Sequence, residues 1–264
     1  MLYLALARLS FRRMLAYRAA TLAGLGTNFF FGMLRAFIFI ALFDAARGGR
    51  VAGYDLPAAI TYTALTQAFI APVMIWGSYD VMQTIRTGQI AGDLTRPLDF
   101  QRFWLAQDVG RAVFNVAARG VTIMAAYALV FDLTWPNSAG RWLVFAVSAV
   151  LAVLASFGWR FLVNLAAFWT VDAVGVGRMA FIGVLLFSGL VVPLRFMPPA
   201  LQTLARALPF AGFMNTPSEI FLGIATGRGL AVALGLQLAW TVALIGLGRV
   251  VYGRGVRRLI IQGG

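Results

Sequence analysis

Several residue types on which enzymes depend are missing from this chain. Its 264 residues include no cysteine, no histidine and no lysine, and Glu219 is the only glutamate. Without cysteine and histidine there is no thiolate nucleophile, disulfide, imidazole base or conventional zinc site. Without lysine there is no Walker A motif, whose lysine reaches the phosphates of a bound nucleotide. The sequence therefore predicts a chain that is not catalytic by itself and binds no metal or cofactor.

Charged surface is also scarce. Only 12% of the residues are charged, 61% are hydrophobic, and the mean hydropathy is +0.84. Soluble domains are about 45–50% apolar and about 25% charged, so this chain is expected to lie in a bilayer.

Six stretches are long and apolar enough to be membrane spans, since a spanning helix needs about 20 such residues. The sequence shows no linker, no fixed repeat and no low-complexity tail, so residues 1–264 are expected to form one all-α integral membrane domain. The six expected spans are Ala20–Phe43, Ala58–Tyr79, Ala112–Phe131, Trp142–Thr170, Met179–Val192 and Leu230–Val251.

The basic residues indicate an orientation. The net charge is +13, and all 22 basic residues are arginines. An even number of spans places both termini on one side, and cytoplasmic flanks carry the excess of positive charge. With both termini in the cytoplasm, thirteen arginines lie inside and only six outside. Topology and anionic lipid headgroups therefore explain the basic character, and nucleic acid is not an expected partner.

The stretch Asp80–Asp99, after the second expected span, has a nearly helical pattern. Such a pattern suits a short interfacial helix, which Pro97 would end because the residue before a proline disfavours helix. The stretch could be an ordinary loop or a docking element for a cytoplasmic partner, and its spacing does not separate the two. The apolar positions are Met82, Ile85, Ile90, Leu94 and Leu98.

The stretch Val192–Gly223 contains five of the nine prolines. This density excludes one straight helix, and broken backbone at membrane depth needs protection by protein or by a water-filled cavity. We expect short re-entrant helices that dip into the outer leaflet, with an external amphipathic cap as the alternative. The residues of interest are Pro193, Pro198, Pro199, Pro209 and Phe210.

Three arginines, Arg35, Arg119 and Arg160, fall within expected spans. Charges at that depth are costly, so each is a candidate for the translocation path. Asn115 and Asn164 lie one helical turn from Arg119 and Arg160 as possible polar neighbours. These two arginines could instead lie near span ends and extend toward the headgroups.

Taken together, the segments resemble the permeases of the type-2 class of ATP-binding-cassette exporters, in particular a bacterial subfamily of similar length. The most specific part is the loop Ile85–Leu98. The basic N-terminal segment, the run Phe168–Thr170, the stretch Pro193–Phe210 and the closing run Arg254–Gly264 also match in order.

The resemblance implies a role for each segment. The N-terminal segment would be an interfacial connecting helix, and the proline-rich stretch would form outer re-entrant helices. The loop would be the coupling helix that docks on the ATPase, with Arg86, Gly88, Gln89, Ile90, Asp93, Leu94, Arg96 and Pro97 as its residues.

The same resemblance implies partners and a location. The ATPase would be a separate ATP-binding-cassette subunit that holds ATP and magnesium, and a second permease would complete a heterodimer or a homodimer. The location would be the bacterial inner membrane, in contact with its lipids, and the cargo would be lipophilic or amphipathic.

Two other classes of protein fit the sequence less well. A secondary transporter or channel usually buries acidic coupling groups at the midplane, whereas Asp108 and Glu219 fall in expected loops or span ends. A lipid-modifying enzyme needs clustered carboxylates or a nucleophile with its base, and Asp93 and Asp99 have no such neighbours. The sequence does not define the cargo.

Overall fold

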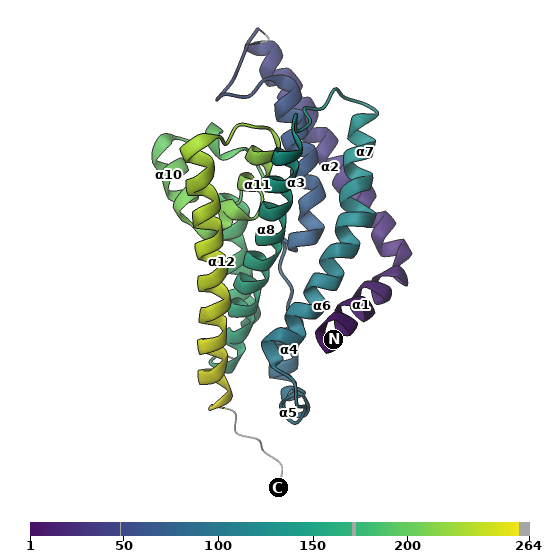
Figure 1. Cartoon of the computed structure of the whole chain (residues 1–264), viewed down its shortest axis with the longest axis vertical. Helices are drawn as coiled ribbons and strands as arrows, with labels where there is room; N and C mark the ends of the chain where they lie inside the picture. Colours follow the sequence, from purple (N-terminus) through teal and green to yellow (C-terminus); the bar gives the residue numbers. More distant parts are fainter. Residues whose placement is uncertain (48, 171–172, 259–264) are drawn as a thin grey trace.

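The computed structural model describes residues 1–47, 49–170 and 173–258. Within these ranges the regular elements are helices, apart from one isolated bridge between Val51 and Tyr54. Residues 259–264 of the closing run lie outside the described part of the chain. Figure 1 shows an elongated bundle in which α8 and α12 run side by side. The all-α prediction is confirmed.

The helices follow one another in a simple order. The first half contains α1 (Leu2–Leu15), α2 (Arg18–Ala45), α3 (Leu56–Val73), α4 (Asp80–Arg86), α5 (Ile90–Leu94), α6 (Phe100–Asn115), the π-helical turn η1 (Val116–Gly120) and α7 (Val121–Ala128). The second half contains α8 (Ala139–Leu165), η2 (Ala166–Phe168), α9 (Ala173–Phe187), η3 (Leu194–Phe196), α10 (Pro199–Ala207), η4 (Pro209–Gly212), α11 (Asn215–Phe221) and α12 (Gly227–Val256).

Four helical stretches are long and apolar enough to cross a membrane: Arg18–Ala45, Leu56–Val73, Ala139–Phe168 and Gly227–Val256. They correspond to the first, second, fourth and sixth expected spans. The fifth is represented by the shorter apolar helix α9. The third is a continuous run of α6, η1 and α7, which begins twelve residues before the expected Ala112.

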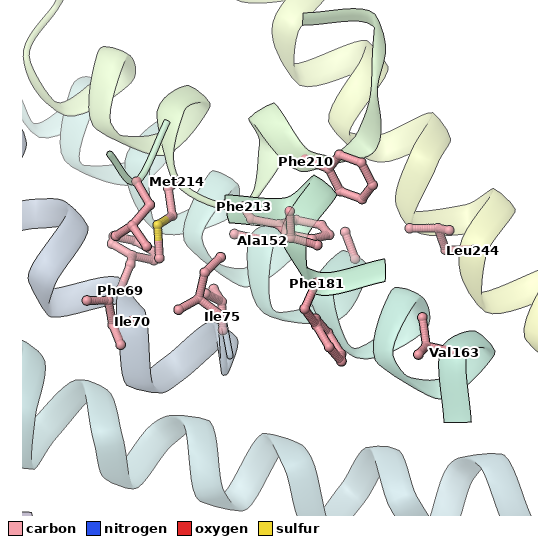
Figure 2. Packing of buried hydrophobic residues seen from close by; sticks show 14 residues of the cluster. Phe69, Ile70, Ile75, Ala152, Val163, Phe181, Phe210, Phe213, Met214 and Leu244 are labelled. Atoms are coloured by element: carbon pink, nitrogen blue, oxygen red, sulfur yellow. The ribbon is translucent and has the colours of Figure 1, made fainter. Parts of the chain in front are cut away.

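The core lies where α3, α8, α9 and α12 meet the segment after α9. Figure 2 shows Phe181, Phe210 and Phe213 packed close to the α8 residue Ala152. Ala152 is completely buried and Phe213 is 1% exposed, so the helices approach closely around α8. In a bilayer, where lipid tails are as apolar as these side chains, such close packing stabilises the bundle through van der Waals contacts.

The two ends of the bundle differ in content. The N-terminus, α4, α5 and the described end of α12 lie at one end, which we call the coupling end (Figure 1). The opposite end carries α10 and α11. Helix α1 packs along α6, and the Ser10 hydroxyl donates to the carbonyl of Gln107 at 2.7 Å. This places the basic N-terminal helix beside the coupling end.

Candidate coupling site

The expected coupling loop is two short helices rather than one. Helices α4 and α5 are separated at Gly88, whose φ of +73° is the left-handed conformation that glycine adopts most easily. Met82, Ile85 and Ile90 are buried, as their spacing predicts. Arg86 and Gln89 are exposed between these anchors. One side of the segment is therefore packed on the bundle while the other is free for a partner.

The second half of this segment extends the exposed surface. Arg96 and Pro97 are exposed, and Arg96 forms a salt bridge of 3.3 Å with Asp93. Of the apolar positions in this segment, Leu94 is 37% exposed, whereas Ile90 is buried. Together Arg86, Gln89, Leu94, Arg96 and Pro97 form a mixed basic and apolar surface, which we call the coupling surface.

Besides apolar packing, helix α8 holds the coupling segment by hydrogen bonds from the Asn164 side chain. Its Oδ1 accepts a hydrogen bond from the backbone N–H of Met82 at 2.9 Å, and its Nδ2 donates to the carbonyl of Ser78 at 2.7 Å. The residue that precedes α4, Tyr79, provides no side-chain cap. Asn164 therefore supplies from α8 the partner that the first turn of α4 would otherwise lack. Nothing in the local sequence of α4 indicates this contact.

One turn earlier on α8, Arg160 joins a buried charge network. Its guanidinium binds both oxygens of Asp108, at 3.0 and 2.8 Å. Arg111 binds the same carboxylate at 2.8 Å. The side chains of Arg160, Asp108 and Arg111 are 6%, 7% and 14% exposed. Two largely buried cations thus share one buried anion, and each of these charges needs its partner.

This network replaces the polar neighbours expected from spacing. Asn164 and Asn115 donate to backbone carbonyls, those of Arg160 and Arg111, rather than to the guanidinium groups. Asp108 lies inside α6 and is 8% exposed, instead of lying at a span end. Its distance of 52 residues from Arg160 hides the pairing from any local sequence pattern.

The same side chains close a break in α3. The helix ends at Val73, six residues before the expected end, and Met74 and Gly77 take positive φ values of 48° and 83°. The carbonyls of Ala71 and Pro72 accept hydrogen bonds from Arg111 at 2.6 and 2.9 Å. The Ser156 hydroxyl donates to the carbonyl of Val73. Side chains from two other helices thus satisfy carbonyl groups at the end of α3, which have no partner within the helix.

A cavity of about 670 Å³ opens beside this network. Because Asp108 is held by two arginines, it is poorly placed to act as a base. No group of three or more acidic residues in the described ranges could hold a metal ion. The cavity can bind a polar group but offers no evident catalytic chemistry. Its polar lining includes Arg13, Asp80, Gln89, Asp108, Arg111 and Asn164.

The carboxylates considered for a lipid-modifying enzyme have structural partners. Asp99 caps α6 by accepting the N–H of Arg102 at 2.8 Å, and it pairs with Arg249 at 3.2 Å. Asp93 pairs with Arg96.

The three arginines within expected spans contact different elements. Arg35 on α2 donates to the carbonyl of Leu190, just after α9, and to the Thr66 hydroxyl at 3.4 Å. Arg119 lies in η1 against Gly24, where a Cβ would run into its guanidinium. Its buried Nε has no hydrogen-bond partner among the described residues. No hydrogen bond or ion pair in the described chain joins Arg35, Arg119 and Arg160 to one another.

The proline-rich stretch forms several short helices, as expected. Pro193 precedes η3, Pro198 and Pro199 begin α10, and Pro209 begins η4, so each proline lies where its missing N–H costs least. Phe210 is buried in the core. The prolines therefore define the breaks between the helices.

Glu219 on α11 holds this stretch together. Its side chain is 3% exposed and pairs with Arg206 at 2.6 Å and with Arg195 at 3.2 Å. Burial disfavours the charge of Arg206, but hydrogen bonds to Glu219 outweigh this and raise the pKa of Arg206. The sequence interpretation placed Glu219 in an expected loop or span end and did not predict this cluster. The one sequence signal for it is that Glu219 is the sole glutamate of the chain.

Asn215 adds a link between this stretch and α3. Its Oδ1 accepts the backbone N–H of Leu194 at 3.1 Å and lies 3.1 Å from the Tyr62 hydroxyl. The same hydroxyl lies 2.8 Å from the carbonyl of Gly189. The end opposite the coupling end is therefore as firmly cross-linked by polar groups as the coupling end itself.

These features define a helical membrane protein with a partly exposed segment held at one end of its bundle. The sequence profile of the family described as ABC-2 family transporter protein matches residues 30–263. The chain belongs to this family of transport proteins, so it is a transmembrane permease of the ATP-binding-cassette class. Permeases of this family are not catalytic by themselves and work with an ATP-binding subunit. No curated protein matches the chain.

Proposed function

We propose that this chain is the permease subunit of an exporter for a lipophilic or amphipathic substrate, powered by a separate ATP-binding subunit that holds ATP and magnesium. The observation that carries the proposal is the coupling surface of α4 and α5. It is exposed, basic in part, and held to the core by Asn164. A chain without lysine has no P-loop of its own, so this surface is the natural place for an ATPase to act.

The buried network supplies a route from the coupling surface to the spans. Movement of α4 would pull on α8 through Asn164, and α8 is tied to α6 and to the end of α3 through Asp108 and Arg111. The break at Met74–Tyr79 lets α3 and α4 change their relative angle without disturbing a helix. ATP-driven closure of the ATPase would then tilt the spans, and its free energy would enter through contacts that differ between the two states.

The proposal includes a topology. The run Phe100–Ala128 and α9 would complete six spans, both termini would be cytoplasmic, and η3 to α11 would form the re-entrant outer segment in the bacterial inner membrane. A second permease would complete the path. The exposed apolar side chains of α2 and α9, such as Phe37 and Met179, offer surface for that permease or for lipid.

The first experiment is affinity purification of the tagged full chain in mild detergent, with mass identification of partners and an ATPase assay. Arg86→Glu should reduce the co-eluting ATPase about tenfold or more, since like charges across an interface cost several kcal/mol. Arg96→Glu should act in the same direction. Arg47→Glu, which changes an exposed arginine after α2, is the control. Unchanged ATPase recovery with Arg86→Glu would refute the docking role.

A secondary transporter or channel remains the second candidate, because the buried Asp108 is the kind of group such proteins use. Its two arginine partners argue for a structural role, since a coupling carboxylate must exchange its ion or proton during the cycle. Purification of the chain alone, with transport driven by an ion gradient and no ATPase, would favour this candidate.

A further inference from the structure

A second hollow lies at the end of the bundle opposite the coupling end, between α12 and the segment from α10 to η4. Its volume is about 410 Å³. The Trp240 indole N–H donates to the carbonyl of Ala207 at 2.9 Å, which joins α12 to the segment after α10. Figure 1 shows α10 beside the upper part of α12. The proposed coupling mechanism does not use this hollow.

One face of α12 lines the hollow and changes from charged at its first residue to apolar further along the helix. Arg228, Val232, Leu236 and Trp240 all line it and are spaced by four residues, so they lie along one side of the helix. Trp240 lies twelve residues after Arg228, and at 1.5 Å per residue the two are about 18 Å apart along the helix axis. This length is close to half the hydrocarbon thickness of about 30 Å. The wall is therefore charged at the membrane surface and apolar along one leaflet.

The opposite wall is mostly apolar, with Arg206 and Thr216 as its polar residues, and the polar side chain of Gln237 on α12 is engaged in hydrogen bonds. Leu208 and Gly212 line this side. The Gln237 amide donates to the carbonyl of Gly212 at 2.7 Å and to that of Ser148 at 2.9 Å. The Oε1 atom of the same side chain accepts a hydrogen bond from the Ser148 hydroxyl at 2.8 Å. A ligand in the hollow therefore needs no polar groups along its length.

The mouth of the hollow is positively charged. Arg228 is exposed, and no hydrogen bond or ion pair to it is found in the described chain. Arg206 also lines the hollow, but Glu219 is shared between Arg206 and Arg195, so this cluster retains a net positive charge. An anion at the mouth would meet Arg228 directly and the Glu219 cluster as a weaker positive neighbour.

We propose that this hollow is a binding site for an anionic phospholipid, with the phosphate at Arg228 and one acyl chain along Val232, Leu236 and Trp240. The two features match the two parts of such a lipid: unpaired cationic charge at the surface, and an apolar slot one leaflet long. The site lies in the outer leaflet if both termini are cytoplasmic. It does not depend on the ATPase or on the identity of the cargo.

The test is quenching of tryptophan fluorescence in the purified full chain by brominated lipids. Trp240 is one of seven tryptophans, so its signal is taken as the difference between the wild type and Trp240→Phe. Brominated phosphatidylglycerol should quench this signal at about fivefold lower mole fraction than brominated phosphatidylcholine, the preference that one arginine near an anionic headgroup confers.

Two variants separate the headgroup from the slot. Arg228→Gln should remove the preference for phosphatidylglycerol while both lipids still quench. Ala233→Phe, which fills the lining of the hollow, should weaken quenching by both lipids. Arg141→Gln, an arginine outside the hollow, is the matched control and should keep the preference.

Three outcomes would overturn the proposal. Equal quenching of the wild type by the two lipids would indicate only the general lipid annulus. An unchanged preference in Arg228→Gln would place the headgroup elsewhere. Absence of quenching by either lipid would show that protein, such as a second copy of the chain, covers this face.

Discussion

Removing the carboxylate of Asp108 should destabilise the chain more than removing either of its partners. The variant Asp108→Asn leaves Arg111 and Arg160 as two cations around a neutral amide. Both arginines are largely buried, with side chains 14% and 6% exposed. Breaking a buried ion pair by removing one partner costs about 3–5 kcal/mol. For a chain of this size, that corresponds to a decrease of roughly 6–20 °C in Tm.

Arg160→Met should cost less, because Asp108 and Arg111 remain as a neutral pair at 2.8 Å. No buried charge is then left uncompensated, so the cost should lie below the roughly 3–5 kcal/mol expected when one partner of a buried ion pair is removed. The double variant Asp108→Asn with Arg160→Met leaves one uncompensated cation instead of two. It should therefore be more stable than Asp108→Asn alone, which is the coupling that a double-mutant cycle measures.

Thermal unfolding of the purified chain in detergent, followed by tryptophan fluorescence, provides the measurement. Asp93→Asn is the control, because Asp93 pairs with a largely exposed arginine and such pairs contribute about 0–1 kcal/mol. The reasoning is refuted if Asp108→Asn has the same Tm as Asp93→Asn, or if the double variant has a lower Tm than Asp108→Asn.

Three further predictions concern the coupling segment, the topology and α2. Asn164→Leu leaves the N–H of Met82 without its partner, at a cost of about 1–3 kcal/mol. This variant should lower substrate-stimulated ATPase activity while the ATPase still co-purifies, and loss of co-purification would contradict the prediction. Single cysteines in this cysteine-free chain should react with an impermeant maleimide from the cytoplasm at Gln89 and from outside at Thr203, and the reverse pattern would exclude the proposed orientation. Arg35→Leu should lower Tm, since the Leu190 carbonyl loses its donor, and a melt like that of the wild type would count against this.

The sequence predicted the long apolar helices well because their signal is local. Helices α2, α8 and α12 begin and end within a few residues of the expected spans. Composition alone is enough for such elements, since an uninterrupted apolar run of this length has few alternatives to a spanning helix. The breaks at the prolines of the outer stretch were predictable for the same reason.

The end of α3 could not be predicted from sequence. The residues after Val73 include Met74, Ile75 and Trp76, which look like a continuation of the span. The helix stops there because Arg111 and Ser156, from other helices, satisfy its last carbonyls. The sharing of Asp108 between two arginines is equally non-local. The exposed residues of the candidate site could thus be named from local spacing, and their docking role stays a prediction, whereas the buried residues depend on tertiary contacts.

The arginines inside the bundle lie where the backbone is interrupted. Arg111 binds the carbonyls at the end of α3, and Arg35 binds the carbonyl of Leu190 after the short helix α9. A buried cation and a free carbonyl are each costly, and each offsets the cost of the other. Such arginines are explained by the fold without any cargo. Arg119 differs, since its Nε has no partner in the described chain and it lies in a π-helical turn, a feature frequent at functional sites. Of the three arginines first considered for the translocation path, Arg119 is therefore the one that the contacts within the described chain do not explain, and its role in transport stays a prediction.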